Sequence, residues 1–216
     1  HKKPFIHLKW AQTLDGQIAT RIGKSKWITS DAARSYVHQE RSLYDAILVG
    51  AQTIRNDNPS LTIRTDKNKL CPFRLILTKS GNLPKNAQVL TDEFKDRTII
   101  ISPLQSAKIT GVQFIKIPED KTDDFQFILK EVYKRDIYSV YIEGGSSILT
   151  QALKTKSYQR ISAYIAPKLL GSGVSAIGDL EILEMDNALL LKNSEWKVLE
   201  KDIVLESQRN ICLQDL

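Results

Sequence analysis

Apolar and polar residues alternate in the first segment of the chain, and this pattern predicts a strand. Ile6, Leu8 and Trp10 fall on one face of an extended segment, whereas His7 and Lys9 fall on the other. Further strands are predicted at Ala46–Val49, Phe73–Thr78, Thr98–Ser102, Val112–Ile117, Tyr138–Ile142 and Arg160–Pro167. The continuous apolar run at Ala46–Val49, flanked by polar loops, is typical of a buried strand.

Other segments carry the spacing of amphipathic helices. Ser30 and Asp31 offer a cap and a first-turn acid for a helix that runs to about Tyr44. A second helix is predicted over about 122–135, and a short one at Ile148–Leu153. In the first helix, the inward stripe is Ala33, Val37 and Tyr44, and a second face carries Arg34, His38 and Arg41 at positions i, i+4 and i+7.

Strands that alternate with helices predict an α/β fold with a mixed, mostly parallel central sheet flanked by helices. Trp196–Glu206 and Gln208–Leu213 are expected to pair as an antiparallel C-terminal hairpin. The sequence has no internal repeat and no long linker rich in Pro, Gly and Ser. The whole chain, residues 1–216, is therefore expected to be a single domain, and because it opens on His1 we expect it to be a piece of a longer protein.

The composition is that of an ordinary globular protein, with 216 residues, 42% hydrophobic and 26% charged. No apolar run approaches the roughly 18 residues that a membrane helix needs. Cys71 and Cys212 lie far apart without a C-x-x-C motif, so neither a disulfide framework nor a zinc site is expected, and a reducing cytoplasm is the simpler location.

The formal net charge is +6. The lysines are interleaved with acids, as in the stretch 116–121, which favours a mixed solvated surface over a nucleic-acid interface. A small phosphorylated substrate would also benefit from the positive balance.

Three motifs that suggest other functions are incomplete. Gly23-Lys24-Ser25 resembles the end of a P-loop, but Ile18 occupies the position of the first glycine. His38 and Glu40 match the H-x-E half of a zinc deaminase, yet no Pro-Cys-x-x-Cys follows, so His38 is expected to be a surface histidine. No G-x-G-x-x-G is present, which argues against a Rossmann site but not against dinucleotide binding in another fold.

The stretch Glu143-Gly144-Gly145-Ser146-Ser147 follows a predicted strand and precedes a predicted helix. The glycines would let a ligand approach the backbone, and the serines would add donors to the positive end of the helix, as in a pyrophosphate site. A tight turn with a serine N-cap is the equally plausible structural alternative. Glu143 favours the functional interpretation, because an acid after a buried strand has little structural use.

A second polar cluster surrounds the apolar run at 46–50. Arg41 and Arg64 carry the guanidinium forks that suit phosphate. With Ser25, Asp57 and Ser60 they form a group that core packing does not require, and we expect it to bind substrate. The turn Asp15-Gly16 is predicted to be structural, whereas Lys9 could contact substrate if that turn closes over a site.

Five segments resemble, in order, the motifs of the reductase domain of the bifunctional riboflavin-biosynthesis deaminase–reductase. They are Lys3–Ala19, Ser25–Ser30, Asp57–Arg64, Val140–Ser146 and Ala163–Gly171. The resemblance implies a dihydrofolate-reductase-like fold, NADPH as cofactor, a homodimer and an N-terminal zinc deaminase in the full-length protein. The implied reaction reduces the ribose C1′ of 5-amino-6-(5-phosphoribosylamino)uracil to the ribitylamino product.

The resemblance also implies roles for individual residues. It implies that Lys9, Ser25, Arg41, Leu61, Arg64 and Glu143 contact substrate, and that Trp27, Thr29, Thr53, Asp57 and the turn of Gly144, Gly145, Ser146 and Ser147 contact the dinucleotide. Lys9 is the candidate for polarising the opened sugar and Glu143 for holding the base or the sugar amine. No metal ligand is expected.

Two other interpretations stay open from the sequence. The chain could be a related diaminopyrimidinone or dihydrofolate-type reductase on the same fold, although the arginine pair favours a phosphorylated substrate. It could also be a non-catalytic module that supports a deaminase partner, in which case degraded site motifs would be expected. A nucleic-acid or membrane partner is not expected.

Overall fold

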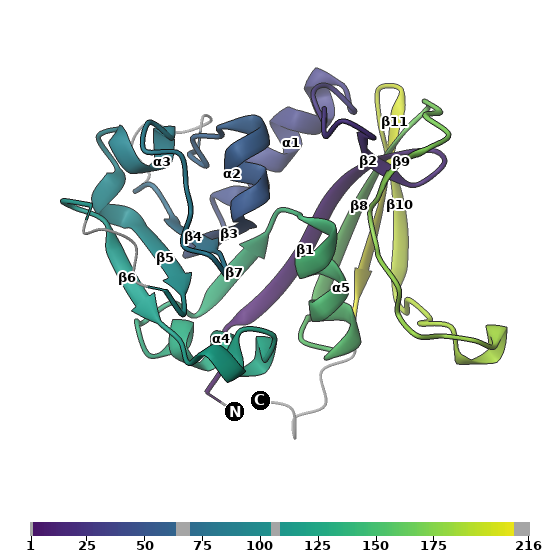
Figure 1. Cartoon of the computed structure of the whole chain (residues 1–216). Helices are drawn as coiled ribbons and strands as arrows, with labels where there is room; N and C mark the ends of the chain where they lie inside the picture. The colour runs from purple at the N-terminus through teal and green to yellow at the C-terminus, as the bar shows by residue number, and fades with distance from the viewer. Residues whose placement is uncertain (1, 64–69, 105–108, 210–216) are drawn as a thin grey trace.

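The computed structural model describes residues 2–63, 70–104 and 109–209, and within these residues nine strands form one sheet. The strand order is β10-β11-β8-β1-β7-β3-β4-β5-β6 (Figure 1). The strands are β1 (Phe5–Thr13), β3 (Ala46–Gly50), β4 (Phe73–Leu77), β5 (Thr98–Ser102), β6 (Gln113–Lys116), β7 (Ser139–Ile142), β8 (Arg160–Ala166), β10 (Ser194–Leu199) and β11 (Asp202–Gln208). A small second sheet pairs β2 (Gln17–Thr20) with β9 (Gly173–Ser175).

In the nine-stranded sheet, every neighbouring pair from β8 to β6 is parallel, and only the two pairs that involve β11 are antiparallel. The sheet is thus mixed and mostly parallel, as the sequence predicts. Parallel strands require crossover connections, and most of those described here contain helices, which lie on both faces of the sheet. The helices are α1 (Asp31–Arg41), α2 (Ala51–Asp57), α3 (Gln88–Thr91), α4 (Phe125–Tyr133) and α5 (Ser146–Lys154), with short 3-10 turns at Lys95–Arg97, Glu119–Lys121 and Met185–Asn187.

Alternate residues of the central strands face two different helical layers. Leu48 and Leu75 pack with α4 and α5 on one face. Ile47 and Ile76 pack with α2 and α3 on the other, and α1 covers that same face farther along, where it packs on Tyr141 and its neighbours. Because the central strands are buried on both faces, their sequences are continuous apolar runs rather than alternating ones.

The helix ends are set by local capping. Ser30 caps α1 by accepting a hydrogen bond from Ala33 N, as the sequence predicts. Asp124 caps α4 in the same way, so this helix begins at Phe125 rather than near residue 122. The first helix ends at Arg41, three residues earlier than predicted, because the backbone N–H of Ser42 caps it with bonds to Gln39 and Glu40.

The predicted C-terminal hairpin is real, but its predicted position is wrong. The hairpin pairs Ser194–Leu199 with Asp202–Gln208, both largely inside the segment expected to be a single strand. The chain reverses at Glu200 and Lys201, where Glu200 has a positive φ of 56°. The expected strand Gln208–Leu213 falls mostly outside the described residues, as does Cys212.

Helix α2 and the small sheet of β2 and β9 were not expected from the sequence. Helix α2 follows β3 directly, and its N-cap Gly50 provides no side-chain hydrogen bond, so the sequence has no start signal there. In the part of the chain that the structure describes, no helix is both long and apolar enough to cross a membrane.

Candidate functional site

The candidate site lies where β7 and β3 end side by side in the sheet. The two strands are parallel neighbours, and the backbone N–H of Glu143, just after β7, donates to Leu48 O of β3 at 3.0 Å. Two adjoining cavities of about 360 and 220 Å³ open here. Both cavities are lined by Lys9, Ser25, Lys26, Trp27, Thr29, Arg34, Asp57 and Glu143.

Each cavity also has lining residues of its own. The larger one adds Val37, His38, Arg41, Asn58, Pro59, Ser60, Leu61 and Gln88. The smaller one adds Trp10, Ala11, Ile18, Ile28, Thr53, Gly144 and Gly145. The structure therefore brings most of the residues expected to contact the dinucleotide or the substrate to these two adjacent cavities; the exceptions are Ser146 and Ser147, which line neither cavity, and Arg64, which lies outside the described residues.

Glu143 and Arg41 form a buried ion pair at the floor of this site. Arg41 Nη2 donates to Glu143 Oε2 at 2.7 Å, and Nε bonds the other carboxylate oxygen. The Glu143 side chain is 8% exposed and that of Arg41 is 13% exposed. Burial alone would raise the pKa of Glu143, but the Arg41 guanidinium outweighs it and holds the pKa below its usual value. Glu143 is therefore an ionised acceptor within the site.

The remaining contacts of Arg41 are with the protein. Its Nη1 donates to Thr62 O at 3.0 Å and lies 3.4 Å from His38 Nδ1. The Nε and Nη2 groups of Arg41, which together could bind a phosphate in a bidentate manner, both bond Glu143. Arg41 thus orients the acid and holds the chain at Thr62. Arg64, the second arginine of the predicted pair, lies outside the described residues.

Lys9 brings a cation to the same place from β1. Its Nζ lies 5.3 Å from the centroid of the Tyr164 ring, and the side chain lines both cavities. The Tyr164 hydroxyl donates to Glu40 Oε2 at 2.6 Å, which fixes the ring beneath the ammonium. Burial lowers the pKa of Lys9, and the nearby Glu143 opposes part of this shift. A lysine so placed can donate a hydrogen bond to a ligand beside Glu143.

The loop before α1 closes one side of the site. Ser25 Oγ donates to Asp57 Oδ1 at 2.6 Å and so ties this loop to the end of α2. The Arg34 guanidinium lies 4.4 Å from the Trp27 ring centroid, and its Nη1 donates to Thr29 O at 2.5 Å. The loop is therefore held by polar contacts at Ser25 and at Thr29, and Trp27, which lies between them in the chain, is 65% exposed.

The turn after β7 leaves open space for a ligand. Gly144 and Gly145 have positive φ angles of 94° and 84°, which L side chains rarely adopt. A Cβ at Gly144 would meet no atom within 4 Å, and one at Gly145 would meet only Ile148, at 3.9 Å. The N-cap of α5 is Gly145, with no side-chain hydrogen bond, so the expected alternative of a serine N-cap is wrong. Ser146 and Ser147 begin the helix but line neither cavity.

Two further residues have positions that the sequence did not indicate. His38 was expected on the surface, but it is half-buried in the wall of the larger cavity beside Arg41. Its spacing from Arg34 and Arg41 on one helical face was the available signal. Gln88 reaches the same cavity from α3, and nothing in the local sequence marks it.

Asp15 has a structural role, as predicted for its turn. Its carboxylate accepts hydrogen bonds from the backbone N–H groups of Leu170 and Gly171, at 3.1 Å and 2.7 Å. It also accepts from Thr13 Oγ1. Within the described ranges, no group of three or more His, Cys, Asp and Glu residues could hold a metal ion.

Comparisons of the chain with known proteins all indicate the same family. The sequence model of the RibD C-terminal domain matches residues 4–205. The riboflavin biosynthesis protein RibD of Aquifex aeolicus is 38% identical over 213 residues, which cover 96% of this chain and 58% of that protein. The RibD of Actinobacillus pleuropneumoniae is 34% identical, with 95% of this chain and 57% of that protein covered. The chain thus spans little more than half the length of these relatives.

Solved structures agree with the sequence comparison. The diaminohydroxyphosphoribosylaminopyrimidine deaminase/5-amino-6-(5-phosphoribosylamino)uracil reductase of Thermotoga maritima superposes with a TM-score of 0.79 and 33% identity, covering 96% of this chain and 57% of that one. Dihydrofolate reductase of Enterococcus faecalis, in a complex with NADP(H), gives a TM-score of 0.54 at 14% identity, covering 96% and 97% of the two chains. The second likeness concerns the fold alone, and that fold is dihydrofolate-reductase-like.

Proposed function

The chain belongs to the RibD C-terminal domain family, and we propose that it reduces the ribose C1′ of 5-amino-6-(5-phosphoribosylamino)uracil with NADPH in riboflavin biosynthesis. One observation carries this proposal. Lys9 and Glu143 line both adjoining cavities, so a cofactor in one and a substrate in the other would meet beside them. A reaction between two bound molecules depends on this kind of alignment.

We assign the dinucleotide to the smaller cavity. The open, positive-φ turn at Gly144 and Gly145 lets a pyrophosphate approach the backbone at the start of α5. Thr53, Trp27, Thr29 and Asp57 complete the cofactor contacts, with Ser146 and Ser147 at the first turn of the helix. When bound, NADPH supplies a hydride.

The larger cavity is assigned to the phosphorylated pyrimidine. Ser25, Ser60 and Leu61 line it, and Lys26 and Arg34 add two cationic side chains. The Nε and Nη2 groups of Arg41 both bond the Glu143 carboxylate, so we assign to Arg41 the role of orienting Glu143. We assign the binding of the 5′-phosphate to Arg64 together with Lys26 and Arg34. Binding the phosphate far from the reacting carbon helps to align that carbon.

Glu143 and Lys9 act on the reacting end of the substrate. The ionised carboxylate of Glu143 accepts a hydrogen bond from the base or from the amine on C1′. The ammonium of Lys9 donates to an oxygen of the ring-opened sugar, which draws electron density from C1′. Their opposite charges suit the two sides of one polar reacting group.

Three broader features are part of the same proposal. The lengths of the relatives support a deaminase domain in the full-length protein, and we place that protein in the cytoplasm.

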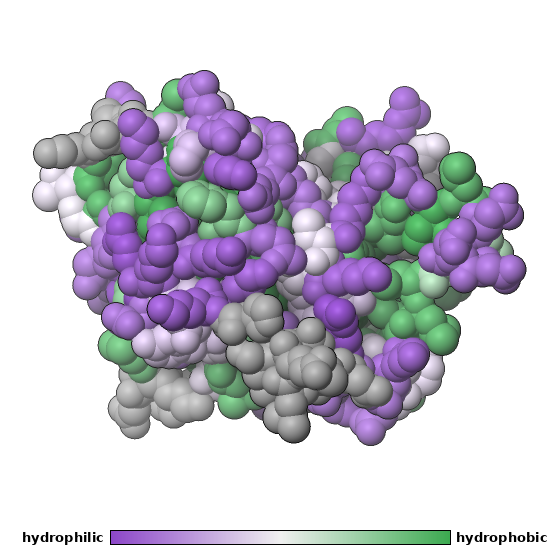
Figure 2. Space-filling model, turned by 90° about the horizontal axis from the view of Figure 1, so that it is seen from below, coloured by the Kyte–Doolittle hydropathy of each residue, from purple (hydrophilic) through white to green (hydrophobic). Residues whose placement is uncertain are grey.

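A homodimer is supported by the outer face of the C-terminal hairpin, where Trp196 and Val198 are 61% and 75% exposed. These two residues pair with Leu205 and Ile203, so the four side chains share one face. Figure 2 shows hydrophobic side chains on the right-hand side of the molecule, the side that in Figure 1 carries both this hairpin and the segment that leads into β10.

The competing functions predict different contents for the larger cavity. A dihydrofolate-type reductase would need an apolar wall for the aminobenzoyl group, whereas this cavity carries Lys26, Arg34 and His38. A non-catalytic module would not need two joined cavities that share a lysine and a buried acid. Both alternatives are therefore weaker than the riboflavin-pathway reductase.

The direct test is turnover by the purified chain. The chain should oxidise NADPH when it receives 5-amino-6-(5-phosphoribosylamino)uracil, with formation of the ribitylamino product confirmed by mass spectrometry. Dihydrofolate and the substrate before deamination serve as comparison compounds, and neither should be consumed. A folded chain that binds NADPH but leaves the deaminated substrate unchanged would refute the proposal.

A further inference from the structure

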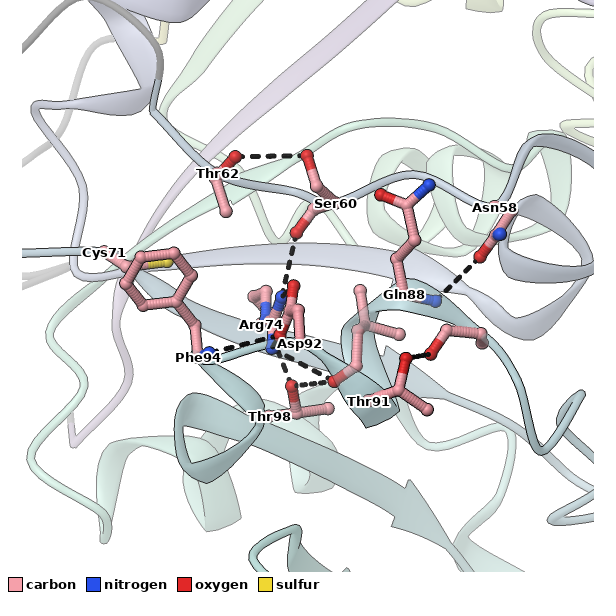
Figure 3. Close-up of polar contacts among 12 residues, drawn as sticks. Asn58, Ser60, Thr62, Cys71, Arg74, Gln88, Thr91, Asp92, Phe94 and Thr98 are labelled. Carbon is pink, nitrogen blue, oxygen red and sulfur yellow. Dashed lines mark hydrogen bonds and ion pairs between the residues drawn. The ribbon is translucent and has the colours of Figure 1, made fainter. Parts of the chain in front are cut away.

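Arg74 is a wholly buried arginine in the parallel part of the sheet, on a strand that is paired on both sides. It lies on β4, and its side chain is 0% exposed. Its guanidinium has five N–H donors and five acceptors (Figure 3). Nε donates to Thr98 Oγ1 at 3.0 Å, Nη1 to Ser60 O at 3.0 Å and Asp92 Oδ2 at 2.6 Å, and Nη2 to Val89 O at 3.0 Å and Asp92 Oδ1 at 2.8 Å. Complete pairing is what makes a buried charge tolerable.

Two of the acceptors of Arg74, the carbonyls of Ser60 and Val89, belong to segments that form one wall of the larger cavity, and Asp92 directly follows the second of these segments. Ser60 lies in the segment 58–62, whose residues Asn58 to Leu61 line that cavity. Val89 belongs to α3, whose first residue, Gln88, lines it too. The two segments also contact each other, because Gln88 N donates to Asn58 Oδ1 at 2.8 Å. Arg74 itself is not among the lining residues of either cavity.

The segment 58–62 depends on such outside contacts for its shape. It has no regular secondary structure, and Asn58 and Leu61 have positive φ angles of 43° and 53°. Asn58 is the C-cap of α2, where Asn commonly adopts this conformation, but a leucine such as Leu61 keeps it only where its surroundings impose it. Arg74 holds the carbonyl of Ser60, and Arg41 holds the carbonyl of Thr62 at 3.0 Å. Leu61, 2% exposed, is thus fixed between two arginines, one of which also orients Glu143.

We propose that Arg74, through its ion pair with Asp92, is a positioning residue for substrate binding. It fixes the wall formed by Ser60, Leu61 and Gln88 against the phosphorylated pyrimidine. The identity of that ligand rests on the proposed function, whereas the geometry of the wall does not. The wall lies apart from Gly144, so cofactor binding does not depend on Arg74.

A purely structural arginine would behave differently. Its replacement would lower the stability of the fold but leave the KM of the folded fraction unchanged. A positioning residue changes the KM for substrate in protein that is folded. Misplacing a binding group by about 1 Å can cost as much as a hundredfold in rate.

The test compares Arg74→Lys and Asp92→Asn with a matched control, Arg97→Lys. Lysine at residue 74 keeps the positive charge, but its three N–H groups cannot donate to all five acceptors. Asp92 is 25% exposed, so its amide is the milder change if the lysine variant does not fold. Arg97 precedes Thr98, and its guanidinium lies 4.1 Å from the Phe73 ring centroid. Among the contacts that the structure describes, Arg97 makes none with the segment 58–62 or with Gln88.

Both test variants should raise the KM for substrate by about ten- to a hundredfold, with a smaller change in kcat and an unchanged Kd for NADPH. Arg97→Lys should leave KM within about twofold of the wild type. Hydrogen exchange in peptides that cover residues 58–62 and 88–92 should accelerate in Asp92→Asn but not in Arg97→Lys. A wild-type KM and unchanged exchange in folded Asp92→Asn would overturn the proposal.

The exchange measurement needs no turnover, which separates this inference from the proposed function. If the wild-type chain lacks reductase activity but Asp92→Asn loosens the wall selectively, the function fails and the role of Arg74 in fixing the wall stands. If the wild type is active and the wall and KM are unaffected by the substitution, the function stands and the positioning role fails.

Discussion

Arg41 Nη2 lies 2.7 Å from Glu143 Oε2, although 102 positions separate the two residues in the chain. The arginine ends α1 and the acid follows β7, so the pair joins the helical layer to the carboxyl end of a central strand. A double-mutant cycle with Arg41→Met and Glu143→Gln should therefore show strong coupling. Removal of one partner leaves the other buried and unpaired, which costs about 3–5 kcal/mol, whereas the double variant should recover part of this loss. Denaturant unfolding measures all three variants.

The same cycle separates two roles for Arg41. If the arginine acts through Glu143, each single variant should lose roughly 10- to 150-fold in kcat/KM, on the phosphorylated substrate and on its dephosphorylated analogue alike. An Arg41 variant that loses activity only on the phosphorylated compound would instead mark this arginine as a phosphate ligand.

Glu143 should make the fold sensitive to acid. Its pKa in the folded chain is below the ordinary value of 4.5, because the Arg41 guanidinium outweighs the effect of burial. A carboxyl with a lowered folded pKa stabilises the fold above its unfolded pKa, and this stabilisation is lost as the pH falls through the folded pKa. The difference in melting temperature between wild type and Glu143→Gln should therefore shrink below pH 4.5. A constant difference down to strongly acidic pH would contradict this.

Lys9 should set the alkaline limit of activity. Burial lowers its pKa from the usual 10.5, so the ammonium loses its proton at a lower pH than a surface lysine does. The value of kcat/KM should fall as pH rises through this lowered pKa. Lys9→Arg keeps its charge at high pH, so its kcat/KM, although lower than that of the wild type, should no longer fall in this pH range. Lys9→Met should be nearly inactive at every pH. An alkaline limb that stays in place in Lys9→Arg would assign it to another group.

Gly144 offers a test of the cofactor turn with a closely matched control. Gly144→Ala and Gly16→Ala both place a methyl group at a positive φ, 94° and 80°, in space where no atom lies within 4 Å. Each should cost about 1–2 kcal/mol of stability from backbone strain. Only Gly144→Ala should raise the Kd for NADPH, because only that turn lines the smaller cavity. Equal, small effects on cofactor binding in both variants would make the turn merely structural.

The outer face of the C-terminal hairpin should control the oligomeric state. Trp196→Glu places a charge in the centre of the exposed apolar face and should convert a dimer to a monomer in light scattering coupled to gel filtration. Tyr138, 52% exposed just before β7, lies several strands away, so Tyr138→Glu should leave the dimer intact. A wild-type chain that is already monomeric would refute the dimer.

Much of the architecture followed from local patterns in the sequence. The alternation that begins at Ile6, the apolar run of β3 and the cap at Ser30 each depend on residues a few positions apart. Such patterns are set by backbone geometry and local hydrogen bonds, so they can be recognised in the sequence without knowledge of the fold. The position of Glu143 after a buried strand belongs to the same class. The hairpin turn at Glu200 was misplaced because a polar pair without Gly, Asn or Pro gives a weak turn signal.

The partners of the charged side chains were decided by the tertiary structure alone. Arg74 lies in a segment predicted as a strand from its apolar neighbours, and the sequence does not show that a buried guanidinium would meet Asp92 and the Ser60 carbonyl. Arg41 suggested phosphate until the fold placed Glu143 against it. Which charges meet depends on strand order and helix placement across a hundred residues. The sequence thus determined the elements and the candidate chemistry, and three-dimensional packing decided which residue serves the ligand and which one positions another residue, because ion pairing requires proximity in space rather than along the chain.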